Sequence, residues 1–425
     1  MKTIIYQVLP RLWGNGKMSC WGADDFAYLK TLGVDYIWYT GIPRHASGKE
    51  FVKGDPGCPY SITDWFDTNP YLADNPDERL KEFDALVVRT HGAGLKCIID
   101  FIPNHVARDY HGDIRHHNWF DGDWTDTLKN DWSDPRTYDA CLATLRFWAS
   151  RGVDGFRFDM VELVPAAQMR LLLSSLKAEF PGLLTIAEVY NKENYRTYLD
   201  YVGFSLIYDK SGLYDTLRNI ICCDGSARAL TWNWQSLGEL QPRMLNFLEN
   251  HDEQRIASPE FAGSASRAYA ALAFSALFNT ASFMLYFGQE AGENAKEGSN
   301  GRTSIFNWCE PAAVGRINKF ISTGKGLDVT GKKVLRRYKE IMSFAAMPVF
   351  RSGRNWDLCY CQGAGFNPDR AFAFLRFDQD EAWLVYCNFS DSQVNTTVNV
   401  PSEPLGRELT VPVKVAPWDA AIVKL

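Results

Sequence analysis

Several short apolar runs of this sequence end in residues with carboxylate or amide side chains. One run ends in Asp-Phe-Ile-Pro-Asn-His at 100–105, a second ends in Asp159, and a third ends in Glu188. A fourth ends in Glu-Asn-His-Asp at 249–252. A carboxylate at the end of an apolar strand costs folding free energy unless it is paired or solvated. Four such ends together indicate a shared catalytic site more strongly than a structural role.

Two carboxyl groups with different protonation states can cleave an acetal with retention of configuration. One must be ionised to attack and the other protonated to release the leaving group. Arg157 lies two residues before Asp159, so both side chains lie on the same face of a strand, where the cation favours the ionised carboxylate. Poor solvation of Glu188 near other carboxylates would raise its pKa and favour the acid role.

The elements that must position these groups alternate between strands and helices over residues 1–347. Strand–helix alternation predicts a parallel sheet, and eight repeats predict an α/β fold of the (β/α)8 TIM-barrel type. Gly92 and Gly152 follow predicted helices at the position where helices commonly stop. The predicted strands are 3–9, 36–39, 96–101, 155–159, 184–188, 204–208, 243–248 and 283–286, and the predicted helices are 24–32, 77–91, 137–151, 165–180, 193–201, 214–222, 266–278 and 332–347.

Two regions depart from this alternation. Residues 104–136 form a long connection after the third strand, which we interpret as a short inserted domain. Residues 348–425 contain short alternating runs separated by turns, which predict a C-terminal antiparallel domain resembling a β-sandwich. The catalytic barrel is therefore expected to span residues 1–347.

Composition excludes several classes of protein. The chain has 425 residues, a net charge of −6, 23% charged and 46% apolar residues, which is typical of a globular protein and argues against binding to a nucleic-acid backbone. The apolar stretch 269–287 carries polar residues and is interpreted as a buried helix and strand, not a membrane span. The ten cysteines are scattered and include no C-x-x-C pair, which is typical of reduced thiols in a reducing compartment. The N-terminal residues are interpreted as a strand and not as a signal peptide, and together these features favour a cytoplasmic location.

Four motifs occur in the order found in a known family. They are DFIPNH at 100–105, GFRFD at 155–159, AEVY at 187–190 and FLENHD at 247–252. With these motifs, the chain resembles the α-amylase family of retaining glycoside hydrolases, glycoside hydrolase family 13. The resemblance covers the whole predicted barrel.

The resemblance implies a role for each matching residue. Asp159 aligns with the nucleophile, Glu188 with the general acid/base, and Asp252 with the third carboxylate, which helps to distort the sugar. Arg157 aligns with the arginine that keeps the nucleophile ionised. The remaining implied substrate-binding and supporting residues are Tyr60, which would stack on the sugar, His105 and His251, which would bond its hydroxyls, and Asp100 and Asn250.

The sequence also departs from the family pattern. Glu162 and Leu163 stand where many calcium-dependent members have Lys-His, and there is no calcium loop after the first strand. Asn104 matches the usual calcium-ligand asparagine and is the one candidate metal ligand. We therefore expect that no cofactor is required, with calcium left as an open alternative.

The leading hypothesis is a hydrolase of α-1,4-glucosidic bonds in starch-derived maltooligosaccharides, acting on an α-glucan oligosaccharide without nucleic-acid or membrane partners. The alternatives are a glucanotransferase or an exo-acting α-glucosidase on the same scaffold, and an inactive glucan-binding relative. Endo or exo action, bond preference and oligomeric state stay open. Trp124 in the insertion, and Trp232 and Trp234 before the seventh strand, are equally compatible with sugar platforms and with core packing.

Overall fold

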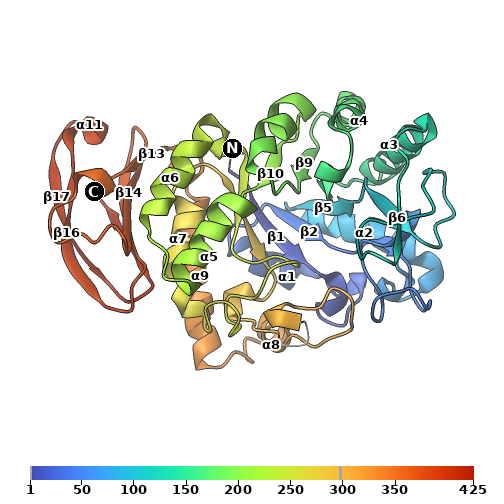
Figure 1. Cartoon of the computed structure of the whole chain (residues 1–425). Coiled ribbons are helices and arrows are strands. Elements are labelled where there is room, and N and C mark those ends of the chain that lie inside the picture. The colour runs from blue at the N-terminus through green and yellow to red at the C-terminus, as the bar shows by residue number, and fades with distance from the viewer. Residues whose placement is uncertain (1, 296–298) are drawn as a thin grey trace.

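The centre of the molecule is a closed barrel of eight parallel strands (Figure 1). The computed structural model describes residues 2–295 and 299–425. Around the barrel the strands follow the order β1-β12-β11-β10-β9-β8-β5-β2. This closed barrel confirms the predicted (β/α)8 fold. Its strands are β1 (Ile4–Val8), β2 (Tyr36–Tyr39), β5 (Lys96–Phe101), β8 (Gly155–Phe158), β9 (Leu184–Ala187), β10 (Leu206–Tyr208), β11 (Met244–Phe247) and β12 (Ser282–Tyr286).

The barrel strands are apolar because helices cover them outside and side chains fill them inside. Every residue of β1, β8, β11 and β12 is buried. Parallel strands covered on both faces show this continuous apolar pattern. The helices are α1 (Ala23–Lys30), α2 (Arg79–Gly92), α3 (Pro135–Ser150), α4 (Ala166–Glu179), α5 (Asp215–Cys222), α6 (Arg228–Leu237), α7 (Tyr269–Leu277), α8 (Ala312–Thr323), α9 (Val329–Ala346) and α10 (Pro348–Ser352).

Several helical segments differ from the sequence prediction. Helices α6 and α8 lie outside the predicted helices. Each has only three buried positions, so the apolar pattern that reveals the other helices is weak. The helix predicted at 193–201 is instead a π-helix at Thr197–Val202.

Two of the long connections contain small antiparallel ladders. Strands β3 (Pro43–His45) and β4 (Ile62–Thr68) pair within the connection after β2. Strands β6 (His105–Ala107) and β7 (Thr127–Lys129) pair within the predicted insertion, which Figure 1 shows at one edge of the barrel. These ladders give the connections a fixed backbone beside the carboxyl ends of the strands.

The C-terminal part forms two antiparallel sheets, drawn in red at the left of Figure 1, as the sequence predicts. Its interior is a separate apolar cluster that includes Leu375, Leu384 and Val398. The larger sheet has the order β13-β14-β15-β18 and the smaller one pairs β16 with β17. The elements are β13 (Arg354–Asp357), β14 (Ala371–Phe377), β15 (Ala382–Asn388), β16 (Val394–Val400), α11 (Ser402–Leu405), β17 (Leu409–Val415) and β18 (Ala420–Lys424).

Aromatic rings join these sheets to the barrel. Phe274 and Phe278 of the α7 region stack on each other and meet Phe372 and Phe374 of β14 edge to face. Aromatic pairs in this geometry are worth about 0.5–1.5 kcal/mol beyond the area that they bury. Among the residues described, no helix combines the length and the apolar character needed to cross a membrane.

Arg376 of β14 is a buried cation at the same junction. Its guanidinium donates hydrogen bonds to the carbonyl oxygens of Phe278 at 3.2 Å, Val349 at 2.9 Å and Gly353 at 2.9 Å. Burial lowers the pKa of Arg376 to about 9. The side chain therefore connects the end of α7, the α10 turn and the C-terminal sheet through three backbone carbonyl oxygens.

We expect Arg376→Ala to lower the free energy of unfolding by about 3 kcal/mol, because it leaves several buried carbonyl oxygens without donors. Thermal and denaturant unfolding measure the loss. Arg354→Ala, at an exposed position of β13 in the same sheet, is the matched control and should change stability by less than about 0.5 kcal/mol. Equal effects of the two variants would contradict a special role for Arg376.

Candidate active site

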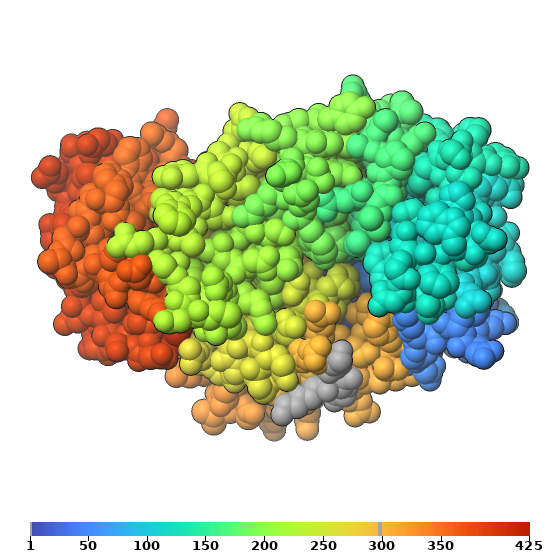
Figure 2. All heavy atoms as spheres, viewed as in Figure 1, coloured from blue at the N-terminus to red at the C-terminus, as the bar shows by residue number. Residues whose placement is uncertain are grey.

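A pocket of about 200 Å³ lies at the carboxyl ends of the barrel strands. Figure 2 shows this face hollowed between the cyan insertion, the yellow segment after β11 and the orange segment near residue 305. Barrel enzymes carry their active sites at this end of the strands. The lining includes Lys53, Cys58, Tyr60, His105, Trp124, Asp126, Thr127, Asp159, Met160, Glu188, Tyr190, His251, Asp252, Ile305 and Phe306.

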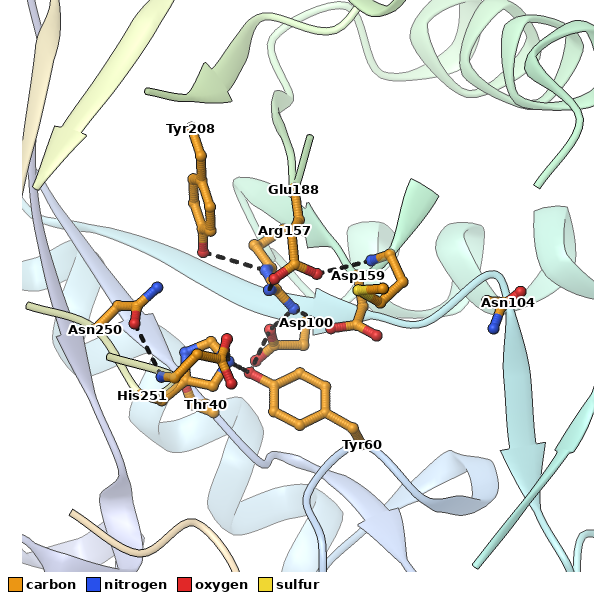
Figure 3. Close-up of polar contacts among 12 residues, drawn as sticks. Thr40, Tyr60, Asp100, Asn104, Arg157, Asp159, Glu188, Tyr208, Asn250 and His251 are labelled. Atoms are coloured by element: carbon orange, nitrogen blue, oxygen red, sulfur yellow. Dashed lines mark hydrogen bonds and ion pairs between the residues drawn. The ribbon is translucent and has the colours of Figure 1, made fainter. Parts of the chain in front are cut away.

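The guanidinium of Arg157 lies at the base of this pocket and is completely buried. Its Nη1 donates to Oδ1 of Asp159 at 2.5 Å, and its Nη2 lies 2.7 Å from Oε1 of Glu188. Its Nε donates to the Tyr208 hydroxyl at 3.2 Å. Figure 3 shows both carboxylates pointing toward this one cation. Two carboxyl groups on one guanidinium are held close together, as a double displacement requires.

Glu188 accepts two further hydrogen bonds from the loops that follow β8 and β9. The backbone N–H of Met160 donates to its Oε2 at 2.8 Å, and the Tyr190 hydroxyl donates to its Oε1 at 2.8 Å. Met160 has a left-handed backbone with φ of 44°, a conformation that is rare for a side chain of this size. The strained turn after Asp159 therefore points a backbone donor at Glu188.

Burial raises the pKa of Glu188, and the negative charge of Asp159 raises it further. The charge of Arg157 and the hydrogen bonds from Met160 and Tyr190 act in the opposite direction. A carboxyl group with a raised pKa keeps its proton at a higher pH than a solvated glutamate does. Glu188 therefore has the environment of a general acid.

Asp252 lies on the other side of the pocket beside His251. Burial and the charge of Glu188 raise the pKa of Asp252 to about 8. Its Oδ2 lies 3.1 Å from Nε2 of His251. The Gln7 amide donates to Nδ1 of His251 at 2.7 Å, which places the imidazole proton on Nε2, toward Asp252 and the Tyr60 hydroxyl.

Tyr60 connects this histidine to Asp100. Its hydroxyl lies 2.6 Å from Nε2 of His251 and donates to Oδ1 of Asp100 at 3.3 Å, while its ring stacks on the imidazole. Trp38 donates to the other oxygen of Asp100 at 2.9 Å. Burial raises the pKa of Asp100 to about 7 although Arg157 opposes the shift. Tyr60 and Asp100 thus hold the pocket floor in one arrangement.

The insertion supplies the opposite wall. Nε2 of His105 lies 3.1 Å from the Tyr60 carbonyl, and its ring packs near Trp124. Burial lowers the pKa of His105 to about 4, so the ring is neutral at pH 7. Lys53 forms an ion pair of 3.1 Å with Asp126, which joins the connection after β2 to the insertion at the pocket edge.

The structure thus brings most of the sequence-predicted residues together, but Asn250 and Asn104 lie apart from the pocket lining. Oδ1 of Asn250 accepts the backbone N–H groups of Asp252 at 2.9 Å and Glu253 at 2.8 Å, so it shapes the loop that carries Asp252. Figure 3 shows Asn104 at a distance from the carboxyl cluster. The residues that share the pocket or its floor are Tyr60, Asp100, His105, Arg157, Asp159, Glu188, His251 and Asp252.

Glu162 has a structural role that sequence reasoning did not assign. Its carboxylate accepts the backbone N–H of Tyr190 at 2.7 Å and the side-chain amide of Asn194 at 2.7 Å. It therefore ties the loop after β8 to the loop after β9, two residues beyond Glu188. A carboxylate three residues after Asp159 was the available signal, but its partners are about thirty residues away and the spacing does not reveal them.

The surroundings of Asn104 do not fit calcium. Its amide nitrogen donates to Oδ2 of Asp121 at 3.0 Å, and the ammonium of Lys129 binds the same oxygen at 2.8 Å and the Leu163 carbonyl at 3.3 Å. The Oδ1 of Asn104 is buried without a partner, but the nitrogen is the atom that faces Asp121. Within residues 2–295 and 299–425, no group of three His, Cys, Asp or Glu side chains is arranged for a metal. The ammonium of Lys129 thus binds the oxygen atoms of Asp121 and Leu163 that would otherwise be available to a metal cation.

We expect the melting temperature of the protein to be unchanged by a chelator, and Lys129→Met to lower the free energy of unfolding by about 1 kcal/mol. The variant keeps the apolar stem and removes only the charge that binds Asp121. Lys81→Met, which removes an exposed ion pair with Glu78, is the control and should have little effect. A calcium-reversible loss of stability in the unmodified protein would contradict this interpretation of Lys129.

Comparison with known proteins supports the resemblance seen in the sequence. Residues 7–133 match the family model described as alpha amylase, catalytic domain. The amino acid transporter heavy chain SLC3A1 of Homo sapiens is 26% identical over 44% of this chain and 33% of its own length. The cyclomaltodextrin glucanotransferase of Bacillus sp. (strain 1-1) is 23% identical over 62% of this chain and 42% of its own length. The chain thus spans about a third to two fifths of these relatives.

The fold is similar over the entire chain. The crystal structure of an alpha-amylase from Lactobacillus plantarum covers 100% of this chain, and 98% of that chain is covered, with a TM-score of 0.75 and 20% identity. The family match begins in β1 and includes the DFIPNH motif, while the other three motifs lie at the corresponding ends of later barrel strands. The chain is thus similar to the α-amylase family, glycoside hydrolase family 13, and the match to the family's catalytic domain covers residues 7–133.

Proposed function

We propose that this protein is a retaining α-glucoside hydrolase that cleaves α-1,4-glucosidic bonds in starch-derived maltooligosaccharides. The observation that carries the proposal is the arrangement of three carboxyl groups in one small pocket, with Asp159 and Glu188 on the guanidinium of Arg157. The family resemblance alone is a weaker argument, because one relative is named as a transporter heavy chain and not as an enzyme. The carboxyl groups supply the chemistry.

In the first step, Asp159 attacks the anomeric carbon and forms a glycosyl ester, while Glu188 donates its proton to the leaving oxygen. In the second step, Glu188 accepts a proton from the water that hydrolyses this ester. Two inversions at the same carbon give net retention, and carboxyl groups about 5–5.5 Å apart suit this route. The hydrogen bonds that hold Glu188 and Arg157 exist before the substrate arrives, so little reorganisation is needed during reaction.

Asp252, His251 and His105 bind the sugar hydroxyls in this proposal. All three line the pocket. The proton on Nε2 of His251 faces the pocket, and burial keeps the histidine neutral by lowering its pKa. A neutral imidazole donates one hydrogen bond without the solvation cost of an ion. The ring of Tyr60 provides an apolar face for the sugar in the same space.

The size of the pocket favours an exo-acting α-glucosidase as the second candidate. A volume of about 200 Å³ is smaller than the roughly 300–1,000 Å³ of pockets for drug-sized ligands, and it suits one sugar ring. Trp124 and Phe306 are on its walls, and the ion pair between Lys53 and Asp126 is beside it. A walled pocket binds a chain end, whereas a groove binds the middle of a chain.

Transfer to a sugar hydroxyl is the remaining alternative on the same scaffold. The glycosyl ester at Asp159 reacts with whichever acceptor reaches it, and a glucanotransferase is among the relatives. A time course of products from maltoheptaose distinguishes the reactions. Mid-sized fragments indicate endo action, early glucose or maltose alone indicates exo action, and products longer than the substrate indicate transfer.

We expect Asp159→Asn and Glu188→Gln each to lower kcat on maltoheptaose at least about a thousandfold, because each removes the nucleophile or the proton donor. Glu253→Gln is a matched control, since this carboxylate lies outside the pocket lining and contacts Lys210 and Tyr214. Proton NMR of the first products should show the α-anomer. Near-normal turnover in either catalytic variant, or a β-anomer as first product, would contradict the assigned roles.

We expect Tyr190→Phe to move the alkaline limb of kcat/KM to higher pH. The Tyr190 hydroxyl lowers the pKa of Glu188 by stabilising its ionised form, so its removal raises that pKa. An acid catalyst is active below its pKa and is lost as the pH rises through it, so a higher pKa extends activity upward. Tyr195→Phe, which leaves Glu188 untouched, is the control. An alkaline limb that stays in place would show that Glu188 does not set it.

A further inference from the structure

A second pocket lies between the barrel and the C-terminal sheets, away from the carboxyl groups. It has a volume of about 610 Å³ and is formed by α6 together with β13 and the turn that follows. Figure 1 shows α6 beside β13, at the junction of the two parts of the chain. The residues that line this pocket are different from those that line the catalytic pocket.

Four aromatic side chains line this junction pocket. Trp232 and Tyr360 are 71% and 67% exposed, and they have the largest exposed fractions of any aromatic side chains in the described part of the chain. Trp234 and Trp356 are partly buried beside them. Exposed aromatic surface costs roughly 25 cal/mol per Å² in water, so two such rings at one pocket indicate a ligand that covers them.

Hydrogen bonds hold three of the four rings, those of Trp234, Trp356 and Tyr360. Nε1 of Trp234 donates to Oδ2 of Asp357 at 3.0 Å, and Thr231 donates to the same oxygen at 2.8 Å. Nε1 of Trp356 donates to the Tyr360 hydroxyl at 3.2 Å. The two bonds to Asp357 connect α6 to the C-terminal sheet, and the bond between Trp356 and Tyr360 holds these two rings together, so this side of the pocket is formed before any ligand binds.

The charges in the pocket are already paired within the protein. Asp357 accepts hydrogen bonds from Thr231 and Trp234, and also from the backbone N–H of Cys359 at 2.8 Å. Arg228 is 3.1 Å from Asp369. The side chains of Gln235 and Asn355 add amide donors and acceptors to the lining. Such a surface suits a neutral ligand that has flat apolar faces and many hydroxyl groups.

We propose that the junction pocket is a second binding site for α-glucan chains, distinct from the catalytic pocket, with the rings of Trp232 and Tyr360 stacking on glucosyl units. The choice of glucan as ligand rests on the proposed function. The volume of about 610 Å³ suits a short stretch of two or three sugar rings. The site would hold a polymer on the enzyme without taking part in cleavage.

The test is electrophoresis of the full chain through native gels that contain soluble starch, with Glu188→Gln as the parent so that the starch is not consumed. We expect the additional changes Trp232→Ala and Tyr360→Ala to weaken the apparent affinity at least about fivefold, which corresponds to the loss of ring stacking. Adding Tyr201→Ala, at an aromatic residue that is 45% exposed elsewhere on the barrel, is the control and should leave retardation unchanged. Equal retardation of the junction variant and its parent would overturn the proposal.

Activity provides a second readout in the otherwise unmodified enzyme. We expect Trp232→Ala with Tyr360→Ala to leave kcat/KM for maltotriose unchanged and to lower it severalfold for soluble starch. An equal loss on both substrates would overturn the proposal by showing a general structural defect. Starch retardation that depends on Trp232, in a chain that cleaves no glucan, would overturn the proposed hydrolysis and leave the second site standing.

Discussion

The buried guanidinium of Arg157 is the charge around which the barrel end is arranged. An ion without water costs several kcal/mol unless anions and hydrogen-bond acceptors replace the solvent. Here Asp159, Glu188 and the Tyr208 hydroxyl contact it, and Asp100 lies 3.6 Å from it. Asp100 lies on β5 and Glu188 follows β9, and these two strands pair with β8 on either side. The register in which these strands pair therefore also sets the positions of the catalytic groups relative to one another.

Most of the fold could be predicted because barrel strands buried on both faces appear in the sequence as short apolar runs. All eight predicted barrel strands overlap observed strands. Strand β13 was not predicted, because Arg-Asn-Trp-Asp shows little apolar alternation and becomes a strand through its pairing with β14. Helix α6 was missed for a related reason, since Trp232 is exposed at the junction pocket and Trp234 is held by a hydrogen bond to Asp357 of the C-terminal sheet.

The residues of the candidate site also fall into those that the sequence could predict and those that it could not. Residues at strand ends, such as Asp159 and Glu188, could be found because the strand places them and the motif surrounds them. Glu162 and Lys129 could not, because their roles depend on loops that meet only after the barrel has closed. The left-handed turn at Met160 also has no sequence signal, since glycine would be the usual residue there. Groups that support a catalytic carboxyl through the backbone are thus harder to predict than the carboxyl itself.

The ammonium of Lys129 has a thermodynamic consequence beyond its local contacts. A dissociable ion stabilises a folded protein by an amount that depends on its free concentration, and this contribution disappears on dilution. A side chain on the same backbone is never diluted, and its effective concentration at the Asp121 carboxylate is set by chain geometry. The contact of Lys129 with Asp121, within the insertion that also carries Trp124, is therefore intramolecular, and its strength does not depend on the concentration of a dissolved ion.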